Sequence, residues 1–345
     1  MAKIPVAVLT GFLGSGKTTV LKHLSETNRL ARTLVLVNEF GEVGLDHQLL
    51  MPIADDTLVA IDSGCICCTI RSDLAETLTS APTRYARGGV RWFDQVVIET
   101  TGIADPAPVL QTILGEAKVA QQYDLAGVIT TVDAINGLHS IQAHPEAMKQ
   151  IAVADRILLT KTDLASGQQV QPLLNQINEL APSAPVSPIL NGVAQADWLF
   201  AGGTYALEGK NADVERWLHG ESDSNPLDDH AHVHDRNRHR RIQASVLTIN
   251  EPVDAALFES CLAALLLFKG SDLLRVKGIV NVLGMDRPIV FHGVQHVFHP
   301  PEILNQWPDE DHRTRIVFIA QNLDHKELQA CFAGIGLATN ANPIT

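Results

Sequence analysis

The feature that most constrains this chain is a glycine-rich loop near its start. Residues 11–18 read GFLGSGKT and fit the pattern G-x-x-x-x-G-K-[ST], which cradles phosphate groups. An apolar run, PVAVLT at 5–10, precedes the loop, and a helix-like segment, KTTVLKHLSE at 17–26, follows it. Because the pattern carries this meaning between a strand and a helix, the context indicates a phosphate-binding loop in an α/β fold.

Each residue type in the loop has a physical role. Gly11, Gly14 and Gly16 permit the tight turns that aim successive backbone N–H groups at phosphate oxygens. Lys17 supplies a cation for the terminal phosphates, and the hydroxyl group of Thr18 is a ligand for Mg²⁺. The helix that follows presents its positive end to the same anion. The loop residues expected to contact a nucleotide are Gly11, Gly14, Ser15, Gly16, Lys17, Thr18 and Thr19.

Short apolar runs alternate with longer amphipathic segments over the first two hundred residues. The apolar runs are continuous and rich in β-branched residues, which is typical of parallel strands covered on both faces. This alternation predicts a P-loop NTPase with a doubly wound, mostly parallel sheet. The predicted strands are 5–10, 33–37, 57–61, 95–99, 126–132, 156–160 and 185–189, and the predicted helices include 17–26, 73–86, 106–120 and 168–180.

The alternation stops near residue 201. The segment 201–240 is polar and rich in turn formers, which indicates a linker or loop with one short helix near its DVERWL stretch. Beyond it, a smaller C-terminal α+β domain is predicted, with strands at 241–249, 273–283, 288–298 and 314–320 and helices at 253–268 and 325–335. The expected organisation is a P-loop domain (1–200), a linker (201–240), a C-terminal domain (241–335) and a tail (336–345).

A second acidic element is expected at the end of a neighbouring strand. In VVIETTG at 96–102, Glu99 ends an apolar run, where it can hold Mg²⁺ through water. Gly102 follows three residues later, where its N–H can reach the γ-phosphate. Together with Lys17 and Thr18, Glu99 completes the predicted catalytic set.

A third segment, RILLTKTD at 156–163, is typical of base recognition. The Asp163 carboxylate can accept hydrogen bonds from N1–H and the 2-amino group of guanine, a donor pair that adenine lacks. The stem of Lys161 is expected along the purine face. Thr160 stands where GTPases usually carry Asn. The pattern therefore favours GTP and GDP over adenine nucleotides.

Three of the five cysteines lie together, in GCICC at 64–68. Thiolates at this spacing suit a soft or borderline ion such as Zn²⁺, Cu⁺ or Co²⁺, and Glu42, a histidine, water or a partner protein can supply a fourth ligand. Alternatively, one or two of the thiols pack inside the protein. The segment lies between the phosphate loop and Glu99, where γ-phosphate-sensing segments belong in such a fold, and this favours the metal site. The predicted ligands are Cys65, Cys67, Cys68 and Glu42.

A histidine-rich run, HAHVHDRNRH at 230–239, is a second metal-binding candidate. Histidines that alternate in a loop can bind Zn²⁺, Ni²⁺ or Co²⁺ loosely, and a solvated polar linker is the alternative. The candidate ligands in this run are His230, His232 and His234. Histidines of FHGVQHVFH (His292, His296 and His299) are expected to be structural, and Cys261 and Cys331 are expected in the core.

Composition and charge exclude several classes of partner. The 345 residues carry a net charge of −13, which argues against a nucleic-acid or anionic-membrane surface. The N-terminal apolar run is too short for a signal peptide, and the apolar stretch 261–268 is far shorter than the ~20 residues of a membrane span. Few, clustered cysteines favour a reducing compartment. We therefore expect a cytoplasmic protein.

Taken in order, these motifs resemble those of the CobW-type P-loop GTPases, which include the zinc-regulated GTPase metalloprotein activators. The resemblance rests on TGFLGSGKTT, NEFGEVGLD, GCICC, IETTGIADP, RILLTKTD, LLRVKG and FHGVQHVF, and it runs from about residue 4 to about residue 335. It implies a GTPase domain followed by a CobW-type C-terminal domain. It also implies that Cys65, Cys67 and Cys68 bind the metal, with Glu42 as a further candidate.

The expected function is that of a GTP-hydrolysing metallochaperone. It would bind Zn²⁺, or Co²⁺, and pass it to a client apo-metalloprotein in a GTP-dependent manner. We expect slow intrinsic turnover, because the sequence shows neither an obvious water-positioning glutamine nor a clear arginine finger. The alternatives are a GTPase switch with redox-sensing thiols, a metal buffer and, less favoured by Asp163, a P-loop kinase.

Overall fold

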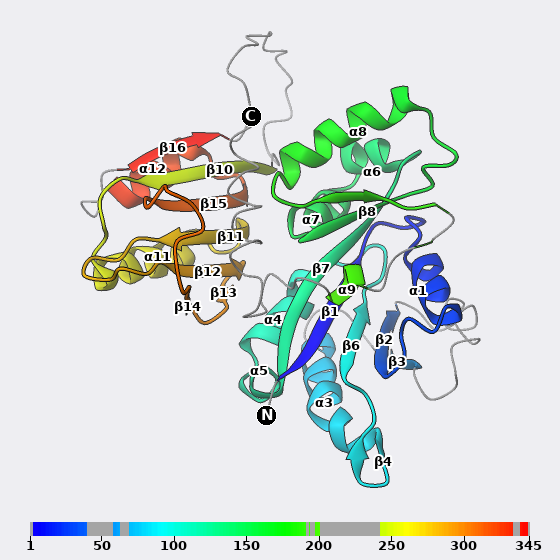
Figure 1. Ribbon diagram of the computed structural model, residues 1–345. Coiled ribbons are helices and arrows are strands. Elements are labelled where there is room, and N and C mark those ends of the chain that lie inside the picture. Colours follow the sequence, from blue (N-terminus) through cyan, green and yellow to red (C-terminus); the bar gives the residue numbers. More distant parts are fainter. Residues whose placement is uncertain are drawn as a thin grey trace. The chain divides into compact units, whose positions relative to one another are not determined.

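The computed structural model describes residues 3–39, 58–62, 69–190, 193, 197–200, 242–333 and 339–343 (Figure 1). The chain divides into two compact units. The first contains the described residues up to Phe200 apart from Ile177–Ser183, and the second contains those from Ile242 onward together with that short segment. The predicted linker, 201–240, lies outside the described residues, and so does its predicted helix.

The first unit is built on a parallel sheet. In the described part of the chain its strand order is β3-β2-β6-β1-β7-β8-β9, and each strand pair is parallel. All the strands predicted in the first 200 residues are present, because continuous apolar runs are buried on both faces. The strands are β1 (Ile4–Thr10), β2 (Thr33–Glu39), β3 (Leu58–Asp62), β6 (Gln95–Glu99), β7 (Tyr123–Asp133), β8 (Arg156–Thr160) and β9 (Val186–Pro188).

Helices connect these strands. The predicted helix 106–120 is interrupted, because Glu116 adopts an extended conformation between two shorter helices. Two further short helices, between β7 and β8, were not predicted, since glycine and proline punctuate that stretch. The helices are α1 (Lys17–Glu26), α3 (Thr69–Arg84), α4 (Ala107–Gly115), α5 (Ala117–Gln122), α6 (Gly137–Ala143), α7 (Pro145–Ala152), α8 (Gly167–Leu180) and α9 (Asp197–Phe200).

The core of the first unit holds the phosphate-loop helix against the sheet. Val20, Leu21 and Leu24 of α1 are fully buried and belong to one cluster with Leu9 of β1 and Val97 of β6. Removing such apolar surface from water stabilises the fold by roughly 1.5–3 kcal/mol per large side chain. This packing holds α1 against β1 and β6.

The second unit is an antiparallel sheet with two helices. Its described strands are ordered β13-β12-β11-β15-β10-β16, and β14 pairs with β12. Helices α11 (Ala255–Lys269) and α12 (His325–Ala333) match the predicted helices closely. The strands are β10 (Ile242–Ile249), β11 (Leu273–Val280), β12 (Ile289–Val294), β13 (Val297–Phe298), β14 (Glu302–Ile303), β15 (Thr314–Gln321) and β16 (Thr339–Pro343).

Two expectations for this unit differ from the structure. The predicted strand 288–298 is a hairpin of β12 and β13, with Gln295 at a φ of 53° in its turn. The stretch 336–345, expected as a tail, contains β16, which pairs with β10. The antiparallel sheet with its helices agrees with the predicted C-terminal α+β domain.

The cysteines and histidines of the second unit are placed as follows. Cys261 is buried as predicted, and burial raises the pKa of its thiol to about 12. Cys331 was predicted in the core but is exposed, so that prediction was wrong. His292 and His299 are buried with ring centroids 5.1 Å apart, whereas His296 is exposed.

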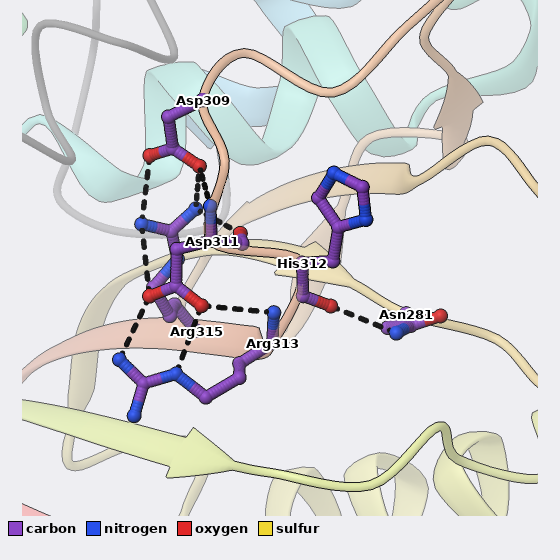
Figure 2. A network of polar contacts seen from close by, with 6 residues as sticks. All are labelled: Asn281, Asp309, Asp311, His312, Arg313 and Arg315. Atoms are coloured by element: carbon purple, nitrogen blue, oxygen red, sulfur yellow. Dashed lines mark hydrogen bonds and ion pairs between the residues drawn. The ribbon is translucent and has the colours of Figure 1, made fainter.

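A polar network holds the loop that leads into β15 (Figure 2). The guanidinium group of Arg315 donates to both carboxylate oxygens of Asp309, at 2.8 and 2.9 Å. Asp311 accepts two side-chain hydrogen bonds of 2.8 Å from Arg313. The hydrogen bonds from Arg313 lower the pKa of Asp311 to about 2, against the opposing effect of burial. Asn281 donates to the carbonyl oxygen of His312 at 2.8 Å, which ties the loop to the end of β11.

Among the helices that the structure describes, none has both the length and the apolar character needed to span a membrane.

Candidate functional site

The candidate site lies at the carboxyl edge of the parallel sheet, where β1 leads into the glycine-rich loop. Gly11, Gly14 and Gly16 have φ angles of 141°, 72° and 94°, a region that other residues rarely adopt. At Gly11 a Cβ would also collide with the hydroxyl and carbonyl oxygens of Thr131 on β7. Glycine is therefore required for the loop to pass this close to the sheet.

The side chain of Lys17 is enclosed by the glycine-rich loop. Its ammonium group donates hydrogen bonds to the carbonyl oxygens of Gly11, at 2.7 Å, and Phe12, at 3.4 Å. Lys17 is only 8% exposed, so its positive charge lies within the loop and is largely shielded from solvent. A cation held there, at the positive end of α1, suits a phosphate group.

The predicted magnesium ligands are brought together across the sheet. Parallel pairing sets Glu99 of β6 beside Leu9 of β1 and Val37 of β2. In this position its carboxylate oxygen lies 3.4 Å from the hydroxyl oxygen of Thr18, and Glu99 is 5% exposed. Two oxygen ligands facing the same space fit a hard cation such as Mg²⁺ that keeps several of its waters.

Gly102 lies in close contact with the phosphate loop. A Cβ built on Gly102 would come within 2.8 Å of backbone atoms of Leu13. On its other side, the amide group of Gln150 donates to the carbonyl oxygens of Gly102, at 3.2 Å, and Ala104, at 3.0 Å. Gln150 is fully buried on α7. The segment after β6 is therefore held between the phosphate loop and a helix.

Helix α7 makes two further contacts with these segments. The ammonium group of Lys149 pairs with the carboxylate of Asp105 at 3.0 Å. The ring of His144, which precedes the helix, stacks on Phe12 of the phosphate loop, with centroids 4.5 Å apart. The same short helix thus contacts both the loop and the segment that follows Glu99.

These segments enclose a cavity of about 450 Å³. Its volume falls in the range of small-molecule sites, roughly 300–1,000 Å³. Predicted site residues from the phosphate loop, from the end of β6 and from the loop after β8 line this cavity. The predicted residues that line it are Gly14, Gly16, Lys17, Thr18, Thr19, Glu99, Gly102 and Lys161.

The side chain of Thr160, at the end of β8, is hydrogen-bonded to the phosphate loop. Its hydroxyl group donates to the carbonyl oxygens of Ser15, at 2.8 Å, and Val132, at 3.2 Å. The hydroxyl groups of Ser15 and Thr131 lie 2.6 Å apart, which adds a second tie between loop and sheet. Thr160, which stands where GTPases usually carry Asn, thus makes a buried contact with the phosphate loop.

Lys161 is oriented by an acidic residue that was not predicted. Its ammonium group lies 2.7 Å from a carboxylate oxygen of Asp133, at the end of β7. Asp133 also accepts hydrogen bonds from the backbone N–H groups of Ile135 and Asn136. Burial opposes ionisation of Asp133, but the hydrogen bonds, led by that from Lys161, outweigh it and lower its pKa.

Asp163 does not line the cavity that contains Lys17 and Glu99. It is exposed in the loop after β8 and lines neither the larger cavity nor a smaller one, of about 240 Å³, on the other side of the phosphate loop. Ser15, Asp133, Gln150 and Lys161 line that smaller cavity, so Lys161 borders both.

The predicted transition-metal ligands lie outside the described residues. These are Glu42, Cys65, Cys67, Cys68, His230, His232 and His234. Within the described ranges, no group of three or more His, Cys, Asp or Glu side chains is arranged to hold a metal ion. Strand β3 ends at Asp62, beside Glu39 of β2, and the six residues that follow lead into α3. The end of β3 is therefore two strand spacings, about 10 Å, from β6.

Sequence reasoning missed three contributors to the site. Asp133 ends a strand at the carboxyl edge of the sheet, a position that is itself a signal for function in parallel sheets. Thr131 lies two residues earlier on the same strand. Gln150 gives no signal, because it reaches Gly102 across 48 residues from a helix that was not predicted.

Comparison with known proteins matches both units. Residues 5–188 match the family described as "CobW/HypB/UreG, nucleotide-binding domain", and residues 242–335 match "Cobalamin synthesis protein cobW C-terminal domain". The chain is 33% identical to the zinc chaperone YjiA of Escherichia coli over 335 residues, 97% of this chain and 99% of that one. It is 35% identical to the zinc-regulated GTPase metalloprotein activator 1 of Schizosaccharomyces pombe over 187 residues, 52% and 44% of the two chains. The crystal structure of Zn(II)-bound YjiA GTPase superposes with a TM-score of 0.68 at 30% identity, covering 97% of this chain and 99% of that one.

Proposed function

Because the chain belongs to the CobW/HypB/UreG family and carries the CobW C-terminal domain, we propose that it is a GTP-dependent zinc chaperone. The chain is a GTPase of this family. It binds Zn²⁺ as cargo at Cys65, Cys67 and Cys68, with Glu42 as a further ligand, and passes the ion to a client apo-metalloprotein. The cytoplasmic location expected from the sequence stays a prediction.

One observation carries this proposal. The phosphate loop, Glu99 and Gly102 line one cavity at the carboxyl edge of the sheet. Strand β3, which leads into the cysteine motif, ends at the same edge, about 10 Å from β6. A change at Gly102 that accompanies loss of the γ-phosphate would therefore occur near the end of the strand that precedes the cysteine motif. The names of the relatives, zinc chaperone and zinc-regulated activator, support the choice of Zn²⁺.

The residues of the cavity fit GTP and Mg²⁺. Lys17 and the loop N–H groups would hold the phosphates, and Thr18 and Glu99 would hold Mg²⁺, which when bound would neutralise charge on the phosphates. Outside the cavity, Asp163 in the loop after β8 would read the edge of the base, and the stem of Lys161 would lie along its face. Thr160 keeps the loop in place through the carbonyl group of Ser15.

Coupling between the two sites is reciprocal. If GTP tightens zinc binding tenfold, zinc tightens GTP binding tenfold, which corresponds to about 1.4 kcal/mol. We expect slow intrinsic hydrolysis that the client accelerates, so that release of the ion coincides with the client's presence. The histidine run 230–239 would then collect ions loosely, and its deletion should leave the tight site intact.

The test measures Zn²⁺ and Co²⁺ affinity by competition with a chelating dye. The full chain is titrated without nucleotide, with GDP and with a non-hydrolysable GTP analogue. A variant with Cys65, Cys67 and Cys68 changed to Ser removes the proposed ligands. Cys331→Ser is the matched control, since it removes an exposed thiol from the other unit.

Tight binding that requires the three thiols and changes with the nucleotide supports the proposal. Equal affinity in all nucleotide states, lost on deletion of 228–240, would indicate a metal buffer. Readily oxidised thiols of low pKa without tight metal binding would indicate a redox-sensing switch instead.

A further inference from the structure

An apolar groove runs along helix α11 in the second unit. Phe258, Cys261 and Leu265 of α11 pack into the core against the antiparallel sheet (Figure 1). Beside this contact, α11 and residues of β11, β12 and β13 line a cavity of about 450 Å³, which we call the α11 groove. Among the described residues that line it, only Glu259 and His299 have titratable side chains, and nearly all the others are apolar. A cavity of this size and composition is typical of binding sites.

The floor of the α11 groove contains two aromatic rings that lie close to the sheet. Phe291 of β12 is paired with Gly278 of β11, and Phe298 of β13 is paired with Gly293 of β12. A Cβ built on either glycine would collide with the ring of its partner. The two rings stack on each other with centroids 5.9 Å apart. Each ring therefore occupies the space of a missing side chain, which keeps the floor low and leaves room above it.

The wall of the α11 groove is one side of the helix. Several of its residues are spaced three or four apart, which places them in one row along α11. They are Ala255, Glu259, Leu262 and Leu266. From Ala255 to Leu266 the row spans about 16 Å, or three helical turns. Because Ala255 and Glu259 are exposed, the groove opens to solvent along this row. Its length and its open side suit a second helix laid against α11.

The charge beside the groove is negative. Residues 251–268 contain three acidic side chains, those of Glu251, Asp254 and Glu259, and no lysine or arginine. Glu259 is exposed and makes no hydrogen bond or ion pair within the part of the chain that the structure describes. Lys269, the one lysine of α11, lies at the opposite end of the helix and pairs with an acidic residue of α12 at 3.8 Å. The carboxylate of Glu259 is therefore open to a cationic group of a ligand.

We propose that the α11 groove binds an amphipathic helix of a partner protein, one that carries Lys or Arg beside its apolar stripe. The apolar side chains lie on the rings of Phe291 and Phe298, and a cationic side chain pairs with Glu259. Such helices bind through anchors at i, i+3 or i+4, and i+7, a span that three turns of α11 match.

Charge decides between this partner and others. An acidic helix fits less well, because its carboxylates would meet Glu259 on a protein of net charge −13. A second copy of this chain carries the same negative charge and is disfavoured for the same reason. Identification of the bound protein as the client rests on the proposed zinc delivery; the binding itself does not.

The test measures binding of labelled helical peptides to the full-length protein by fluorescence anisotropy. The first peptide has Leu at helical spacing flanked by Lys, the second has the same composition in an order without an apolar stripe, and the third has Glu in place of Lys. Ala263→Arg places a bulky cation at an exposed position that lines the groove. Ala264→Arg is the matched control, since Ala264 is exposed on the same helix but does not line the groove.

A second pair of variants tests the charge alone. Glu259→Gln removes the carboxylate with little change of shape, and Glu310→Gln makes the same change at an exposed position away from α11. Glu259→Gln should weaken binding of the Lys peptide about two- to fivefold at low salt and less at high salt. Glu310→Gln should bind as wild type does.

The Lys peptide should bind wild type more tightly than either of the other peptides. Ala263→Arg should weaken this binding at least about tenfold, and Ala264→Arg should stay within about twofold of wild type. Because both alanines are exposed, both variants should unfold at the temperature of wild type, which thermal unfolding checks.

Three results would overturn the proposal. They are equal binding by the two Arg variants, equal binding of the Lys peptide and either other peptide, and self-association of the chain that Ala263→Arg abolishes, which would assign the groove to a second copy. No probe contains metal or nucleotide, so failure here and failure of GTP-dependent zinc binding are separate results.

Discussion

The hydroxyl group of Thr160 donates a 2.8 Å hydrogen bond to the carbonyl oxygen of Ser15. Both residues are buried, and the bond joins the end of β8 to the phosphate loop across 145 positions of sequence. The segments predicted to read the base and to bind phosphate are therefore parts of one hydrogen-bonded structure.

Replacing Thr160 by Val should weaken guanine nucleotide binding about 5- to 30-fold. The change keeps the shape but leaves the carbonyl oxygen of Ser15 without this donor, a cost of about 1–2 kcal/mol for a buried group. The affinity for fluorescent GDP measures the effect. Thr160→Ser keeps the hydroxyl group and should bind within about threefold of wild type. If the Val and Ser variants bind equally, the hydroxyl group does not support the loop.

Replacing Gln150 by Leu should reduce the preference for GTP over GDP. The variant loses the amide that holds the carbonyl oxygens of Gly102 and Ala104, so the γ-phosphate has to order this segment itself. We expect about a tenfold loss of affinity for a non-hydrolysable GTP analogue, with GDP affinity nearly unchanged, since each hydrogen bond contributes about 0.5–1.5 kcal/mol. Gln171→Leu, an exposed glutamine on α8, is the control. Parallel loss of GTP and GDP affinity would contradict a role specific to the Gly102 segment.

Replacing Asp163 by Asn should convert guanine preference into xanthine preference. A carboxylate accepts from N1–H and the 2-amino group, whereas an amide can donate to the 2-oxo group of xanthine. We expect GDP to bind at least about 100-fold less tightly and XDP to bind more tightly than it binds wild type. Competition of GDP, XDP and ADP against a fluorescent nucleotide measures both changes. An unchanged order of affinities would place base recognition elsewhere.

Acid should weaken the second unit through Asp311. Its pKa is lowered to about 2 in the folded state, from 3.8 in the unfolded chain, chiefly by the hydrogen bonds from Arg313. The stabilisation is therefore complete above about pH 5 and is lost as the pH falls toward 2. Because the side chain is 30% exposed, we expect about 1 kcal/mol.

The measurement follows hydrogen exchange of peptides covering β15 between pH 6 and pH 3, corrected for intrinsic rates. Asp311→Asn should exchange faster at pH 6 but depend less on pH than wild type. Asp286→Asn, at an exposed carboxylate, should behave as wild type. Identical pH dependence in the two variants would contradict the role of Asp311.

The sheet of the first unit was predictable because its signal is local. A run such as QVVIE, buried over four of its five positions, has to be a strand covered on both faces, and β6 is such a strand. The motif around Lys17 predicted the loop for the same reason. Helices α6 and α7 were missed, since Gly137 and Pro145 interrupt a short stretch that only tertiary packing makes helical.

Other parts of the site depend on contacts that no local pattern encodes. Nothing near Gln150 in the sequence indicates that its amide meets Gly102. Cys331 lies on a helix whose apolar pattern suggested burial, but the helix turns Leu328 and Phe332 inward and leaves the thiol outside. A shift of one position around a helix, 100°, is enough to reverse such a prediction.

The close packing of Gly102 against Leu13 connects the cavity at the carboxyl edge of the sheet with the protein surface. Since no methyl group fits between them, displacement of Gly102 toward the loop cannot be absorbed locally and must move Leu13 as well. The side chain of Leu13 is 62% exposed. A movement of Gly102 toward the loop would therefore also change the position of an apolar group at the surface.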